Sequence, residues 1–228
     1  MQSKHGHGIA ECRTTLRAKP TMTTVSESLK PRAQSIAQHE MGHYVVATVL
    51  GFRTGDVCIA LLRHNGHRGG AGIDLAQSLA STADVSLYLR RRVQVLYAGA
   101  AGEALTANNI VNQERALKIL ETRTAGADQD HAKARELVHI LRSIEFAQSD
   151  ANDSLAVQGQ LDALSDELWQ ATIVLVEEHS RAICGLAGNL VDRAMGAAST
   201  VANMAAALTE AELGALAGVQ ALPRATWP

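Results

Sequence analysis

The feature that most constrains this chain is a His-Glu-x-x-His pattern at residues 39 to 43, set in a largely apolar stretch that ends at Gly51. This composition predicts a helix closed by the glycine. Histidines four residues apart project from one helical face. An exposed helix with two unrelated histidines is the alternative. The apolar surroundings argue against it, because buried polar side chains need partners and a metal ion satisfies all three at once.

The spacing of the pattern suits zinc-dependent hydrolysis. Zinc held by His39, His43 and a third protein ligand keeps one position for water and lowers the pKa of that water toward neutrality. Glu40 is then placed to take the water's proton and pass it to a leaving amine. The residues alone leave the third ligand open. Glu103 on a later helix is one candidate, and the segment around Asp130 would ordinarily be a loop with a helix cap.

Composition favours a mainly α-helical protein. Aromatic residues make up only 3% of the 228 residues and alanine is abundant, which suits closely packed helices. A formal net charge of -2 gives no electrostatic case for nucleic acid. The cysteines, Cys12, Cys58 and Cys184, are too widely spaced for a disulfide framework or a Cys-x-x-Cys metal site. No apolar run is long enough to cross a bilayer, so we expect a soluble, cytoplasmic protein without a membrane segment.

The chain divides into a flexible N-terminal arm, residues 1–32, and one domain, residues 33–222. After the motif helix, strands are predicted at 56–62 and 71–75, joined by a loop that carries His64 and His67 as solvated residues. The fold class is therefore a helical domain with one small β-hairpin beside the metal-binding helix. A free edge of that hairpin offers a place for an extended peptide.

Helical periodicity continues through the rest of the chain. A helix over 81–108 begins with a capping pattern, and its small residues 98–102 allow close packing, which we expect against the metal helix. Arg90, Arg91 and Arg92 on this helix are expected to be solvated or salt-bridged, with a role in substrate binding as the less favoured alternative. Further helices are predicted over 112–121, over 161–194 as one helix or as a pair broken near Gly185 and Gly188, and from a capping box at Thr209.

Taken in order, four stretches resemble the protease domain of the FtsH family of ATP-dependent zinc metallopeptidases. Residues 37–43 match its His-Glu-x-Gly-His helix, 97–105 resemble its Gly-Gly-Arg-Ala-Ala-Glu segment, and 125–130 resemble its Gly-Ala-x-x-Asp segment. The helices over 168–194 and 208–216 resemble its C-terminal helices. The family's arginine is replaced here by Ala100.

The resemblance implies the ligand set and the reaction. It implies that Asp130 is the third zinc ligand beside His39 and His43, that Glu40 is the general base, and that Glu103 is a supporting residue that does not bind zinc. The expected function is a zinc metalloendopeptidase acting on flexible or unfolded polypeptides. The sequence has no phosphate-binding loop, so hydrolysis would be ATP-independent. The expected partners are the polypeptide substrate and either further copies of the chain or a separate ATPase.

Two alternatives stay open at this point. One is a catalytically silent module of the same fold that binds peptides or regulates a partner. The other is a zinc hydrolase for a small amide, which would need a closed pocket in place of a groove with a free strand edge.

Overall fold

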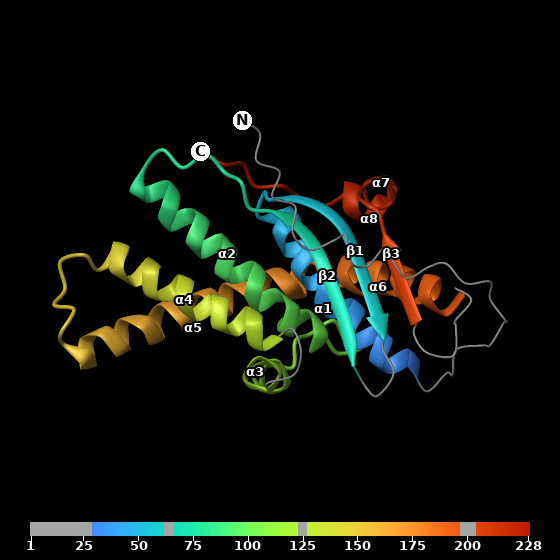
Figure 1. Cartoon of the computed structure of the whole chain (residues 1–228), viewed down its shortest axis with the longest axis horizontal. Helices are drawn as coiled ribbons and strands as arrows, with labels where there is room; N and C mark the ends of the chain where they lie inside the picture. Colours follow the sequence, from blue (N-terminus) through green and yellow to red (C-terminus); the bar gives the residue numbers. More distant parts are fainter. Residues whose placement is uncertain (1–28, 62–65, 123–126, 197–203) are drawn as a thin grey trace.

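A computed structural model describes residues 29–61, 66–122, 127–196 and 204–228. The fold is mainly helical with a small antiparallel sheet, as the sequence predicts (Figure 1). The elements are α1 (Lys30–Val49), β1 (Arg53–Leu61), β2 (His67–Asp74), α2 (Thr82–Glu103), α3 (Gln113–Glu121), α4 (Ala127–Glu145), α5 (Ser154–Glu178), α6 (Ser180–Gly196), β3 (Met204–Leu208), α7 (Glu210–Ala215) and α8 (Ala217–Gln220).

Helix α1 is the centre of the fold. It packs against α2 on one side, α6 on another and the strands β1 and β2 on a third, so the segment from His39 to Val49 is buried throughout. The helix ends as predicted, with Gly51 in the left-handed region at φ 86°. It begins earlier than the predicted domain start, because Pro31 lies in its first turn, where its fixed φ is tolerated. Residues 1–28 of the predicted arm lie outside the described part of the chain.

The predicted hairpin is present, and a third strand joins it. The sheet order is β2-β1-β3, with Cys58 of β1 opposite Gly70 of β2 and Ile59 of β1 opposite Ala206 of β3. The expectation of a single hairpin is therefore corrected to three strands. Strand β3 carries three consecutive alanines, whose intrinsic preference is helical, so the sequence gives no signal of it. His67, expected in the loop, begins β2; His64 lies outside the described residues.

The predicted helix starts are confirmed at two capping boxes. Ser81 and Asp84 cap α2, and Thr209 and Glu212 cap α7. Within each pair, the side chain of one residue accepts a hydrogen bond from the backbone amide of the other. The region predicted over 161–194 as one helix or as two forms two helices, α5 and α6. The break lies at His179 between α5 and α6, and Gly185 and Gly188 lie inside α6.

The C-terminal tail closes the end of α1. The Trp227 indole donates a hydrogen bond to the Gly51 carbonyl over 2.7 Å, and the Ala225 amide donates to the Val49 carbonyl over 2.8 Å. The indole also makes an edge contact with Phe52, with ring centroids 5.2 Å apart. The folded unit therefore extends past residue 222, the predicted end of the domain. Within the described residues, every helix is too short or too polar to span a membrane.

Candidate metal centre

Helices α1 and α2 cross almost backbone to backbone at the motif. A side chain at Gly42 would overlap the Ala98 carbonyl, and one at Gly102 would come within 2.7 Å of the Gln38 carbonyl oxygen. Small residues on both helices are needed for this approach, which confirms the expected packing of the 98–102 segment against the metal helix. The crossing presses the face of α1 that carries the histidines against α2.

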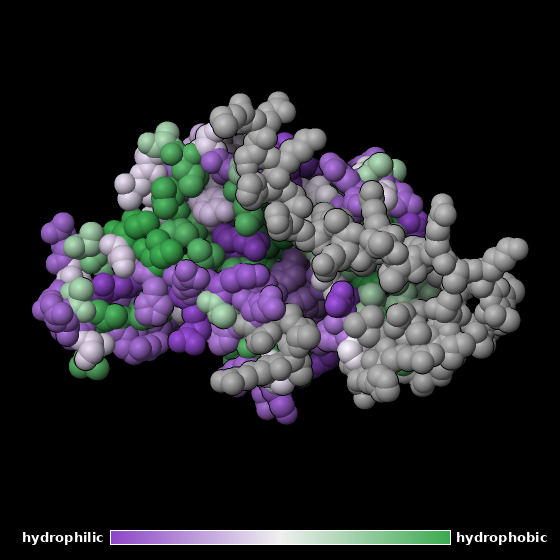
Figure 2. All heavy atoms as spheres, in the orientation of Figure 1, coloured by the Kyte–Doolittle hydropathy of each residue, from purple (hydrophilic) through white to green (hydrophobic). Residues whose placement is uncertain are grey.

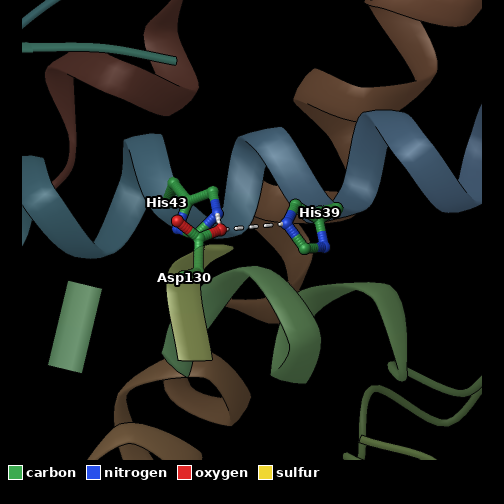
Figure 3. Close-up of side chains that lie close together, drawn as sticks. All are labelled: His39, His43 and Asp130. Atoms are coloured by element: carbon green, nitrogen blue, oxygen red, sulfur yellow. Dashed lines mark ion pairs between the residues drawn. The ribbon is translucent and has the colours of Figure 1, made fainter. Parts of the chain in front are cut away.

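Three side chains meet at this crossing. His39 and His43 come from α1 and Asp130 comes from the first turn of α4, and their ligand atoms lie within 4.8 Å of one another (Figure 3). The Asp130 Oδ2 atom lies 3.0 Å from His43 Nε2 and 3.6 Å from His39 Nε2. The two histidines are only 8% exposed. The cluster therefore joins two buried histidines to a partly buried aspartate about 90 positions further along the chain.

Two of these separations are close to those of a tetrahedral metal ion. Nitrogen and oxygen ligands about 2.1 Å from a tetrahedral zinc lie about 3.4 Å from each other, against 3.0 and 3.6 Å at Asp130, whereas the widest separation in the cluster is 4.8 Å. Gly99 of α2 faces both imidazoles: a Cβ atom there would collide with His43 Nε2 and come within 2.7 Å of His39 Nε2. The glycine thus keeps open the space onto which the two nitrogens converge.

The outer nitrogens of both histidines have partners on α2. His43 Nδ1 donates to the Val95 carbonyl over 2.7 Å, and His39 Nδ1 lies 3.2 Å from the Glu103 carboxylate. With a proton held on Nδ1, each Nε2 atom can offer its lone pair to a metal ion once it no longer donates to Asp130, and such outer hydrogen bonds commonly orient metal-bound histidines. Glu103 therefore contacts the ring nitrogen that faces away from the cluster. It lies beside His39 and outside the group of three converging ligand atoms.

The charges of the cluster favour a bound cation. Burial opposes charge on His39, but its hydrogen bonds to Asp130 and Glu103 outweigh burial and raise its pKa to about 10. Burial would raise the pKa of Asp130, but hydrogen bonds from His39 and His43 outweigh it and hold that pKa well below its usual range. Without a metal, the cluster therefore holds a proton on His39 at neutral pH. A divalent cation would replace that proton.

Glu40 lies beside the cluster and against the sheet. It is 9% exposed, and burial raises the pKa of its carboxyl, opposed by the nearby His39 and His43. Its Oε1 atom packs on the backbone of Gly69 in β2, where any Cβ atom would overlap it. The carboxylate thus lies between the metal-ligand cluster and the outer strand of the sheet.

The predicted site residues His39, Glu40, His43, Glu103 and Asp130 all lie in this one region. Two contributors were missed. The Val95 carbonyl belongs to the backbone and has no sequence signature. Gly69 did carry a signal, namely a glycine inside a β-rich segment.

Compared with known proteins, the chain matches no protein-family model, and no curated protein is significantly similar to it. The resemblance to FtsH-type peptidases therefore stands on the four sequence motifs quoted above.

Proposed function

We propose that this chain is a zinc metalloendopeptidase of the FtsH type that hydrolyses peptide bonds in flexible or unfolded polypeptides. The observation that carries the proposal is the convergence of the buried His39 and His43 with the partly buried Asp130, with Glu40 one residue along the same helix from His39. Burial of His39, Glu40 and His43 beside the partly buried Asp130 is costly unless these groups share a ligand or a reaction.

His39, His43 and Asp130 would hold the zinc ion. Two nitrogen ligands and one oxygen ligand are a set that catalytic zinc accepts, with a fourth position left for water. When bound, zinc lowers the pKa of that water and polarises the carbonyl of the scissile bond. The Val95 carbonyl and the Glu103 carboxylate, through the outer nitrogens of the histidines, fix the orientation of the two rings.

Glu40 is the general base in this proposal. A base works best when its pKa lies near the working pH, and burial moves the Glu40 carboxyl in that direction. Its carboxylate would accept the proton of the attacking water and then deliver it to the amine that leaves. The backbone of Gly69, packed on Oε1, restricts where the carboxylate can turn.

The sheet suggests how the substrate is held. Strand β2 lies at the edge of the β2-β1-β3 sheet and, among the described residues, has no neighbour on its outer side. An extended peptide can add to such an edge through backbone hydrogen bonds, whatever its side chains are. Because β2 packs on Glu40, the added strand would run next to the base. Only a flexible or unfolded polypeptide can present such a stretch, which supports the proposed substrate class.

The test uses unfolded casein and the zinc-loaded protein. Glu40→Gln should retain zinc and lose activity by about 10²- to 10⁴-fold, the usual contribution of a general base. Glu136→Gln on the exposed face of α4 is the matched control and should cleave at the wild-type rate. Equal turnover by Glu40→Gln would remove the proposed base, and a zinc-loaded wild type that cleaves nothing would contradict peptidase function.

A further inference from the structure

Arg90, Arg91 and Arg92 stand in sequence on α2 and, at about 100° per residue, point in three directions. Arg90 donates to Glu145 of α4 and to Glu167 of α5, each over 2.7 Å. Arg91 lies over the Trp227 ring, 4.4 Å from its centroid. Both side chains thus hold other elements against α2. The expected salt-bridged or solvated patch describes these two arginines.

Arg92 differs from its neighbours. Among the residues that the structure describes, its guanidinium has no hydrogen bond or ion pair. It is partly buried, and the charged or titratable groups near it are Asp130 and Tyr88. Burial lowers the pKa of Arg92, and only the proximity of these two groups works against that. A guanidinium offers five N–H donors. Because no buried side-chain nitrogen among the described residues lacks a partner, the unpaired donors of Arg92 are open to solvent and accessible to a ligand.

The position of Arg92 links it to the metal centre. Val95 lies three residues further along α2, and its carbonyl accepts a hydrogen bond from His43. Gly99 lies seven residues further along and faces both imidazoles. Residues at these spacings share one helical face. Arg92 therefore projects from the face of α2 that meets the cluster, and the influence of Asp130 on its pKa agrees with this.

The same face continues to the far end of strand β2. Burial raises the pKa of Tyr88, and the Arg92 guanidinium opposes this while the Asp74 carboxylate at the end of β2 adds to it. From Gly99 to Tyr88 the helix rises about 17 Å, and from Gly69 to Asp74 the strand extends about 17 Å. A peptide along β2 would therefore follow this face of α2. Figure 2 shows hydrophilic atoms next to a hydrophobic surface that covers part of α2 and α4.

We propose that Arg92 binds a carboxylate of the peptide substrate, so that the site favours chains with an acidic side chain or a C-terminal carboxylate near the cleaved bond. Arg92 lies roughly 10 Å along α2 from Gly99, the length of about three extended residues. The carboxylate would lie within about that distance of the reacting carbonyl. A guanidinium binds a carboxylate with two parallel hydrogen bonds, which gives this subsite its selectivity. The proposal rests on the proposed peptidase function.

The test separates substrate binding from hydrolysis. Zinc-loaded Glu40→Gln protein is titrated with three labelled peptides of otherwise identical sequence: one with glutamate near the expected cleavage position and an amidated end, one with glutamine and a free C-terminus, and one with glutamine and an amidated end. A carboxylate bound by Arg92 should tighten binding about tenfold over the neutral peptide. If the glutamate peptide binds more tightly than the neutral one, the carboxylate comes from a side chain. If the peptide with the free C-terminus does, it comes from the chain end.

Variants of the arginine then test its role. When Arg92→Gln is added to the Glu40→Gln protein, the peptides with a carboxylate should bind no more tightly than the neutral peptide. Arg92→Lys should keep part of the preference, because lysine keeps the charge without the planar guanidinium. Arg135→Gln on the exposed face of α4 is the control and should leave the ratio unchanged. Zinc content and the thermal transition of each variant report on the fold and on any indirect effect through Asp130.

The outcomes are distinct. Equal binding of all three peptides, or a preference that survives in Arg92→Gln, overturns the role of Arg92 even if wild type cleaves peptides. A preference that disappears in Arg92→Gln supports the carboxylate subsite, including in a protein that binds peptides and cleaves none, where the proposed peptidase function alone would fail. If Arg92→Gln loses zinc and binds all three peptides equally more weakly, Arg92 acts by holding Asp130 in place. That result would overturn a direct role of Arg92 in binding the substrate.

Discussion

Helices α1 and α4 contribute to the same cluster but are held very differently. Helix α1 is covered by α2, α6 and the sheet, and every residue from His39 to Val49 is buried. Helix α4 packs on α2, α3 and α5 and exposes Lys133, Arg135 and Glu136 to solvent. The histidine pair is thus set by one buried helix, whereas the position of Asp130 depends on how a surface helix docks. Changes at α1 should affect the whole fold, and changes around α4 should affect the cluster or local stability.

The largest effect is expected at the α1–α2 crossing. Gly42→Ala places a methyl group against the Ala98 carbonyl, which is backbone and cannot turn away. It should lower the free energy of unfolding by about 3 kcal/mol. The same change at Gly185, where nothing lies within 4 Å, should raise it by about 0.5 kcal/mol. Urea unfolding of the metal-free proteins measures both. Equal effects at the two glycines would show that the crossing is not close-packed.

The next effect concerns the orientation of His39. Glu103→Gln replaces the charged partner of its Nδ1 atom and should weaken zinc binding by about 10- to 100-fold, the usual cost of losing an outer hydrogen bond. Competition with a chelator of known affinity measures this, with Glu136→Gln as the control. Complete loss of zinc in Glu103→Gln would instead favour Glu103 as a direct ligand.

Zinc affinity should also depend on pH in a defined direction. Because hydrogen bonds to Asp130 and Glu103 raise the pKa of His39 to about 10, against burial, the metal-free cluster holds a proton that zinc must displace. Affinity should therefore fall as pH falls, by about tenfold per pH unit below that pKa. Calorimetry at pH 8 in buffers of different ionisation enthalpy should detect release of about one proton. An affinity independent of pH between 7 and 9 would contradict this charge arrangement.

The smallest effect is expected where α4 is tied to its neighbours. Arg90→Gln removes the paired hydrogen bonds to Glu145 and the bond to Glu167, all partly exposed, and should cost about 1 kcal/mol of unfolding free energy. The control is Arg135→Gln on the exposed face of α4, the helix that carries Glu145. It should change the free energy of unfolding by less than about 0.5 kcal/mol. If both variants unfold at the same urea concentration, the ion pairs do not hold α4 in place.

The contrast between the two helices also explains what could be predicted from sequence. The spacing of His39 and His43 places them on one face of any helix, and the capping boxes at Ser81 and Thr209 are local patterns. Asp130 has no local pattern that distinguishes a metal ligand from a residue of a helix start. Its assignment came from the family resemblance, because only the docking of α4 brings it to the histidines.

The remaining misses have similar causes. Strand β3 forms from an alanine-rich stretch because β1 offers it a partner, which overrides its helical preference. The break between α5 and α6 falls at His179, where no glycine or proline marks it. The outer partner of His43 is the Val95 backbone carbonyl, which every residue type would supply.

The central claim is that His39, His43 and Asp130 bind one zinc ion. Zinc content and zinc-edge X-ray absorption of wild type and Asp130→Ala test it most directly. We predict one zinc per wild-type chain with two imidazole nitrogens at about 2.0 Å, and binding weakened by more than about 100-fold in Asp130→Ala with the helical fold retained. Unchanged affinity and coordination in Asp130→Ala would contradict it.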